Sequence, residues 1–216
     1  MELKGCAKIG NLTKRMCAEC GKDSKYIVCF FGGAIIRLIA ILFSNFLLLW
    51  ITSFVDEGLI NEEDSKDLYQ WIILTSTIGT IVLLPIIGQL GDKIPSKILI
   101  PVSFILRGIC GYSFIWMTDP QSIISMTLCI LLIIFTVVEA ISIEVLLMRD
   151  MPSQIRGLMM GAFTFFGLLG KVIFTLVGGQ MFDRISRSAP FVFLGIMDTM
   201  LVLLVFTLMC FGKFNQ

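Results

Sequence analysis

Six apolar stretches of about twenty residues, each bounded by a short polar segment, constrain this chain more than any other feature. Of its 216 residues 56% are hydrophobic and 15% are charged, which is more apolar surface than a soluble domain of this size can bury. Backbone groups in hydrocarbon must be bonded within their own segment, and these stretches lack the two-residue alternation of barrel strands. We therefore predict an all-α membrane protein with six transmembrane helices, at residues 27–55, 70–90, 98–117, 122–148, 158–181 and 191–211.

The distribution of Lys and Arg around the spans predicts an orientation. Residues 1–26 form a basic N-terminal arm with six cations, residues 27–211 hold the transmembrane bundle, and residues 212–216 form a short tail. With the arm inside, the inside segments carry eleven cations, whereas the outside loops carry three and include the acidic segment 56–67. Cytoplasmic loops of membrane proteins carry the excess of positive charge. We expect an integral, multi-pass membrane protein with both termini in the cytosol.

The motif GQLGDKI at residues 88–94 recurs as GQMFDRI at residues 179–185. Gly, Gln, Asp, a cation and Ile match at an offset of 91 residues, and each copy ends the second span of a three-span unit. Three crossings separate the copies, so they lie on opposite sides of the membrane. This pattern predicts two inverted three-helix repeats, an arrangement found in secondary transporters. The glycines of the two copies predict close approach of neighbouring helices.

Two segments resemble signatures of the major facilitator superfamily. The stretch GQLGDKIPSK, with Gly88, Asp92 and Lys93, resembles a degenerate copy of that family's Gly-x-Leu-x-Asp-Arg-x-Gly-Arg-Lys loop, in which Pro95 and Ser96 stand in place of Gly-Arg. The segment that begins MPSQIRG and continues into a glycine-spaced helix is similar to the family's Pro…Arg-Gly loop; its matching residues include Pro152, Arg156 and Gly157. The resemblance implies that Gly88, Asp92, Lys93, Arg156 and Gly157 act in conformational gating.

The resemblance covers about residue 26 to the end of the chain and implies the second, C-terminal half of a twelve-helix fold. It implies secondary-active transport of a small solute by alternating access, in which a second six-helix half completes the cavity. The alternative is a membrane scaffold or accessory subunit that keeps the half-fold without transporting.

Six charged residues lie within the spans, where each costs about 2.5–3.5 kcal/mol at a helix centre. We expect such residues to face a cavity or each other, and polar side chains recur at helical spacing around several of them. The candidate cavity residues are Arg37, Asn45, Glu139 and Lys171. Arg37 and Glu139 lie at similar depth and are expected to form a pair or to share one network. Burial disfavours the charged form of a carboxyl group, so Glu139 could also carry a proton for coupled transport.

A structural ion network is the alternative for these charges, and it is favoured for Arg107, because the resemblance places Arg107 on a peripheral helix. The Trp residues 50, 71 and 116 stand near the outer ends of the first three spans, which is typical of an interface belt.

Other classes of function receive little support. The chain has no His, no nucleophile motif and no phosphate-binding loop, so we expect neither an enzyme nor a cofactor. Zinc ligation by Cys6, Cys17 and Cys20 would lack a fourth ligand, and we expect no metal. The cations of the arm are explained by orientation and by contact with anionic membrane lipid, without a nucleic-acid partner.

Overall fold

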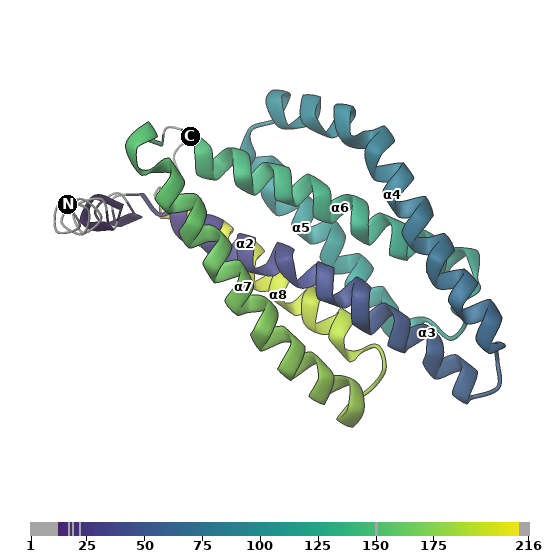
Figure 1. Cartoon of the computed structure of the whole chain (residues 1–216). Coiled ribbons are helices and arrows are strands. Elements are labelled where there is room, and N and C mark those ends of the chain that lie inside the picture. Colours follow the sequence, from purple (N-terminus) through teal and green to yellow (C-terminus); the bar gives the residue numbers. More distant parts are fainter. Residues whose placement is uncertain (1–12, 17, 19, 22, 150, 212–216) are drawn as a thin grey trace, which may run out of the picture.

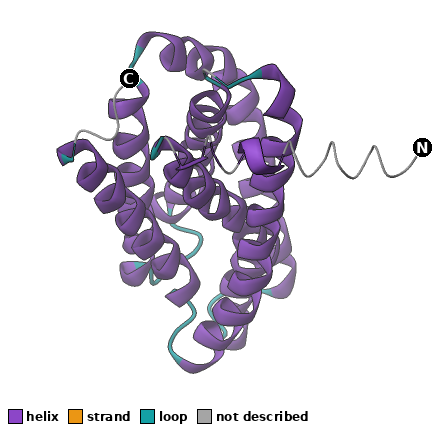
Figure 2. Cartoon of the chain, turned by 90° about the vertical axis from the view of Figure 1, so that its left-hand side faces the viewer, coloured by secondary structure: helices purple, strands orange, loops and turns teal. Residues whose placement is uncertain are grey.

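The computed structural model describes residues 13–16, 18, 20, 21, 23–149 and 151–211, which include nearly all of the predicted bundle (Figure 1). No strand occurs among these residues (Figure 2). Six helical spans within them are long and apolar enough to cross a membrane. Their elements are α2 (Lys25–Ile41), η1 (Leu42–Phe46), α3 (Leu47–Asp56), α4 (Glu62–Lys93), α5 (Ser96–Ser113), η2 (Phe114–Trp116), α6 (Ile123–Met148), α7 (Ser153–Arg184) and α8 (Ala189–Cys210). The six-span prediction is confirmed.

The helices extend beyond the apolar stretches where charge favours their ends. α4 begins eight residues before its apolar stretch, and three acidic residues, Glu62, Glu63 and Asp64, occupy its first turn. Lys93 and Arg184 stand in the last turns of α4 and α7. Acidic side chains stabilise a helix N-terminus and basic side chains stabilise a C-terminus, because each opposes the charge of the helix dipole there.

The first span, α2–η1–α3, contains a π-helical segment at residues 42–46. A π-bulge interrupts the regular i to i−4 hydrogen-bond ladder of a helix. The hydroxyl group of Tyr69 on α4 donates a hydrogen bond to the carbonyl oxygen of Phe43 at 3.2 Å. α4 thus supplies a partner for a backbone group within the bulge.

The repeat predicted from the short motif is visible in the helix boundaries. α4 and α7 both contain 32 residues, and both their starts (153 − 62) and their ends (184 − 93) differ by 91. α4 packs against α6, and α7 packs against α2, so each second helix covers the first helix of the other unit. α4 and α7 lie on opposite sides of the remaining helices (Figure 1). The two units are α2 to α5 and α6 to α8.

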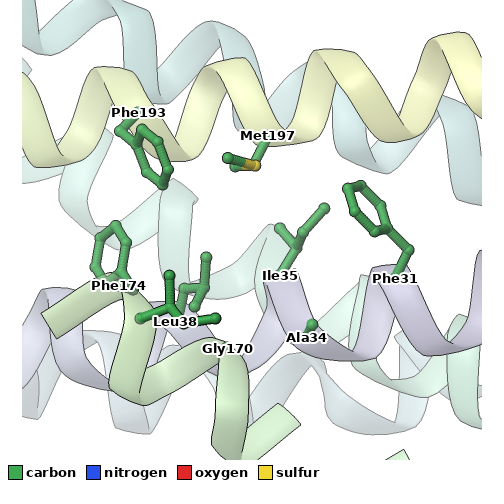
Figure 3. Close-up of a pocket in the computed structure, with 9 residues that line it drawn as sticks. Phe31, Ala34, Ile35, Leu38, Gly170, Phe174, Phe193 and Met197 are labelled. Atoms are coloured by element: carbon green, nitrogen blue, oxygen red, sulfur yellow. The ribbon is translucent and has the colours of Figure 1, made fainter. Parts of the chain in front are cut away.

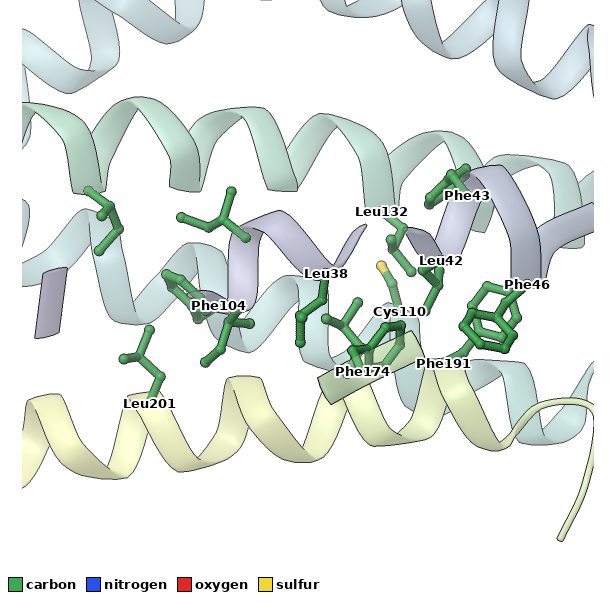
Figure 4. Packing of buried hydrophobic residues seen from close by; sticks show 14 of the residues in the cluster. Leu38, Leu42, Phe43, Phe46, Phe104, Cys110, Leu132, Phe174, Phe191 and Leu201 are labelled. Atoms are coloured by element: carbon green, nitrogen blue, oxygen red, sulfur yellow. The ribbon is translucent and has the colours of Figure 1, made fainter. Parts of the chain in front are cut away.

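The core lies between α2, α5, α6 and α8, and is filled by aliphatic and aromatic side chains from all four (Figure 4). Trp50 is fully buried, with its ring centroid 5.3 Å from that of Phe114 and 6.2 Å from that of Phe191. The prediction that Trp50 belongs to an interface belt is therefore wrong: aromatic side chains at the outer end of the bundle enclose it. Trp71 and Trp116 are exposed, as a belt requires.

Small residues let α5 and α8 approach closely. A Cβ atom on Gly111 would lie 2.9 Å from the carbonyl oxygen of Phe191, and one on Gly195 would lie 3.1 Å from that of Gly108. Gly88, Gly91 and Gly179 behave differently, because no atom of the described chain lies within 4 Å of a Cβ built on them. The expected helix contacts at these three glycines are absent from the described bundle; they lie on α4 and α7, its least covered helices.

Candidate functional site

Arg107 of α5 lies at the centre of a buried charge network. Its Nε donates to Oδ2 of Asp198 on α8 at 3.0 Å, and its Nη2 contacts the other oxygen of the same carboxylate. Its Nη1 forms an ion pair with Oε2 of Glu139 on α6 and lies 3.5 Å from the hydroxyl group of Thr136. The side chains of Arg107, Glu139 and Asp198 are fully buried. Three helices are thus joined through one guanidinium group.

The expected pairing of Arg37 with Glu139 is wrong. The helical stripe on α6 that contains Thr136, Glu139 and Ser142 is buried, and Glu139 meets Arg107 instead. The cause is the close packing of α5 on α8, which brings Arg107 into the bundle interior. The structural role favoured for Arg107 agrees with this position, although the side chain is central to the bundle.

The network contains one more acid than base. Asp198 receives two contacts from Arg107, whereas Oε1 of Glu139 has no hydrogen-bond partner in the described part of the chain. Buried ion pairs repay their desolvation only when their remaining polar atoms are satisfied. Glu139 is therefore the less satisfied acid, and a proton on it would make the network electrically neutral.

Arg37 of α2 lies apart from this network, at the seam between α2 and α7. Its aliphatic carbons pack against Gly167, whose missing side chain makes room for them. The guanidinium group lies 5.4 Å from the ring centroid of Phe163 and 3.5 Å from the hydroxyl group of Thr164. Nε of Arg37 is buried without a hydrogen-bond partner, and no acid within the described residues pairs with the side chain.

The other two candidate cavity residues stand nearby along the same helices. Lys171 is partly buried on α7, four residues beyond Gly167, and Asn45 is exposed within the π-helical segment of the first span. The structure therefore places Arg37, Asn45 and Lys171 along the first span and α7, and places Glu139 elsewhere.

The candidate gating residues occupy helix ends. Gly88, Asp92 and Lys93 belong to the last turns of α4; Lys93 is exposed, and the side chain of Asp92 lies outside the described structure. Arg156 and Gly157 are exposed in the first turns of α7, where Arg156 donates a hydrogen bond to the carbonyl oxygen of Met151 at 3.4 Å. Their role in gating stays a prediction.

Two contacts group the loops by side. Arg187, after α7, pairs with Glu57, after α3, at 2.7 Å, which places these two predicted outside loops at one end of the bundle. Arg15 of the arm donates to the side-chain oxygen of Gln154 at 3.0 Å, and both residues are predicted to be inside. Most of the arm 1–26 and the whole tail 212–216 lie outside the described residues.

An apolar cavity of about 200 Å³ opens between α2, α7 and α8 (Figure 3). Phe31, Phe174, Phe193 and Met197 point into it, and its other lining residues are also apolar. Ligand sites in proteins combine apolar walls with a few placed polar groups. This cavity lacks such groups, so it is a poor candidate for a polar solute.

Among the described residues no three His, Cys, Asp or Glu side chains are arranged to hold a metal ion; Cys6 and Cys17 lie outside them.

Six helices that are long and apolar enough to cross a membrane define an integral, multi-pass membrane protein, and their arrangement in two repeats of three is one found in secondary transporters. The sequence model described as Major Facilitator Superfamily matches residues 30–212, and the chain belongs to that superfamily. It is similar to Magnetosome protein MamH of Paramagnetospirillum magneticum (strain ATCC 700264 / AMB-1), with 29% identity over 161 residues, which are 70% of this chain and 35% of that protein. The chain thus spans about a third of the length of that relative. No solved structure matches the chain.

Proposed function

We propose that the chain transports a small solute across a membrane by alternating access, as one six-helix half of a major facilitator carrier. Membership of the superfamily supports transport in general. The name of the magnetosome relative states no solute.

The observation that carries this proposal is the incomplete cover of α4 and α7. Within the apolar stretch of each of these two helices only 17% of the residues are buried, whereas 56% are buried in the apolar stretch of the α5 span. The repeat glycines Gly88, Gly91 and Gly179 have open space beside them on these same helices. Small residues favour close packing between transmembrane helices. We assign these surfaces to contact with a second six-helix half, either another chain or another segment of a longer one.

Arg37 lies at the seam of the first span and α7, and Asn45 and Lys171 belong to the same two spans, so we assign the solute path to this side of the bundle. Glu139 is assigned a different task. As the under-satisfied acid of the Arg107 network, it is the group at which a coupling proton would bind, away from the solute. The proposal therefore separates a solute side from a proton side.

The test is uptake into proteoliposomes that contain the chain, with its natural second half if one is recovered by affinity purification. Transport predicts uptake above that of empty vesicles, with saturation at high solute concentration. Arg37→Gln is expected to lose uptake while it still inserts. Glu139→Gln is expected to lose the acceleration caused by a pH gradient.

The scaffold alternative predicts a different result in the same experiment. Purification in a fixed complex, with no uptake above empty vesicles for that complex, would identify a non-transporting subunit. An antibody against residues 212–216 complements this test, because a polypeptide of about twice this length would show that the second half is joined in the same chain.

A further inference from the structure

We propose that the solute is an anion with two negative charges, a dicarboxylate or a phosphate compound, held between Arg37 and Lys171. This inference rests on the proposed transport function and adds the class of substrate.

The acids of the described spans leave the cation Arg37 without an acidic partner. Glu139 and Asp198 are the carboxylates deep within the described spans, and both are held by Arg107 at full burial. Glu144 is exposed close to the end of α6, and Asp56 is the last residue of α3. The acids of α4 stand in its first two turns or its last turn, and Asp183 stands in the last turn of α7. No acid of the described spans is therefore positioned to neutralise a second cation at mid-depth.

The guanidinium group of Arg37 has N–H donors that no described residue accepts from. A guanidinium group has five N–H donors. Its one hydrogen bond to a described residue is the 3.5 Å contact to Thr164, and its buried Nε has no partner. An unmatched charge inside a membrane is costly, and unsatisfied buried donors add to that cost. A carboxylate or phosphate group, which can accept two parallel N–H bonds from arginine, would satisfy both requirements.

Lys171 is a second cation on the helix that Arg37 contacts. Contacts of Arg37 with Gly167 and of Phe46 with Gly178 show that the first span, α2–η1–α3, and α7 run in the same direction along the seam. Lys171 lies four residues beyond Gly167 on α7, which is about 6 Å along a helix axis. No ion pair or side-chain hydrogen bond joins it to another described residue. Like charges that share a low-dielectric seam repel each other, and an anion bound between them would remove that repulsion.

Two cations without an acidic partner along one seam together indicate a divalent anion. A cationic solute would be repelled, and a neutral solute would leave both charges uncompensated. The same anionic chemistry could come from a lipid phosphate, so the experiment has an arm for each source.

The experiment measures thermal unfolding of the full chain in an uncharged detergent. Succinate and inorganic phosphate are the probes, and sodium chloride at equal ionic strength is the reference. At several times its Kd, at least one probe is expected to raise Tm by about 2–4 °C. Arg37→Gln and Lys171→Gln are each expected to abolish this rise. Gly167→Ala keeps both charges but displaces Arg37, and is expected to reduce it. Lys66→Gln, which changes an exposed cation on α4, is the matched control and should keep the rise.

The outcomes are distinct. The absence of a rise with both probes, or a rise that survives in Arg37→Gln, overturns the proposal. Phosphatidylglycerol that raises Tm in an Arg37-dependent way, when neither free probe does so, assigns the site to lipid and also overturns it. Uptake assays separate this question from transport itself. Saturable uptake of a neutral or cationic solute with no anion effect would contradict only the substrate class. An Arg37-dependent anion effect without uptake would contradict only transport.

Discussion

Arg107 and Asp198 form a buried ion pair between α5 and α8, and the 91 residues that separate them equal the offset between the two halves of the internal repeat. They therefore occupy equivalent positions on the third helix of each unit. α5 and α8 approach closely there: a Cβ atom added to Gly108 would lie 3.5 Å from that of Asp198, and one added to Gly195 would lie 3.1 Å from the carbonyl oxygen of Gly108. A single ion pair thus joins the two repeats where equivalent helices meet.

This arrangement has a consequence for the rest of the bundle. By holding Glu139 as well as Asp198, Arg107 withdraws the deep acids from the seam of α2 and α7. Arg37 and Lys171 are left without acidic partners in the described chain. The network that joins the repeats therefore also sets the charge of the proposed solute path.

The close packing of α5 on α8 predicts a strong effect of Gly111→Ala. Its new methyl group would lie 2.9 Å from the backbone oxygen of Phe191, which cannot move without shifting α8. We expect a loss of about 1–3 kcal/mol, seen as a lower Tm in detergent. Gly161→Ala is the matched control: this glycine also lies within a helix but has open space beside it. That substitution should leave Tm unchanged or raise it, because alanine is the better helix former. Equal effects at the two sites would contradict the packing described.

The contact at the π-helical segment predicts a smaller effect of Tyr69→Phe. The substitution removes the hydroxyl group that donates to the carbonyl oxygen of Phe43, and keeps the ring. The expected loss is about 1 kcal/mol, the usual net value of one hydrogen bond, measured by thermal unfolding. An unchanged Tm would show that water or another donor satisfies this carbonyl group equally well.

The orientation can be tested by cysteine labelling in a cysteine-free background. Leu59 is exposed in the loop after α3, and Ser153 is exposed at the start of α7. Both termini in the cytosol require that a membrane-impermeant maleimide label Leu59→Cys in intact cells, and label Ser153→Cys only after permeabilisation. The reverse pattern would show that the bundle is inserted the other way.

The spans and the repeat were accessible from the sequence, because both follow from patterns along the chain. Hydrocarbon thickness fixes the length of an apolar stretch, and helix ends followed charge within a few residues. The early start of α4 was missed, since its acidic first turns lie outside the apolar stretch.

The charge network of Arg107, Glu139 and Asp198 could not be predicted from such patterns along the chain. The similar depth of Arg37 and Glu139 in the bilayer suggested that they pair, but depth does not determine which helices face each other. That choice depends on how closely α5 and α8 approach, and hence on Gly111 and Gly195. One signal was present in the sequence: the repeat offset of 91 residues connects Arg107 with Asp198. Applying the offset to every charged residue would have identified this pair.

The most direct test of the account is a double-mutant cycle on Arg107 and Asp198. Arg107→Gln leaves two buried carboxylates facing each other and is expected to lose about 3–5 kcal/mol. Asp198→Asn should cost less, because Arg107 keeps Glu139. If the three residues share one network, adding Asp198→Asn to Arg107→Gln raises the stability above that of Arg107→Gln alone. The expected coupling energy is about 1–3 kcal/mol. If Arg107→Gln alone does not fold but the double variant does, the coupling energy has the predicted sign. Additive losses, with the double variant less stable than either single variant, would contradict a shared network at the centre of the two repeats.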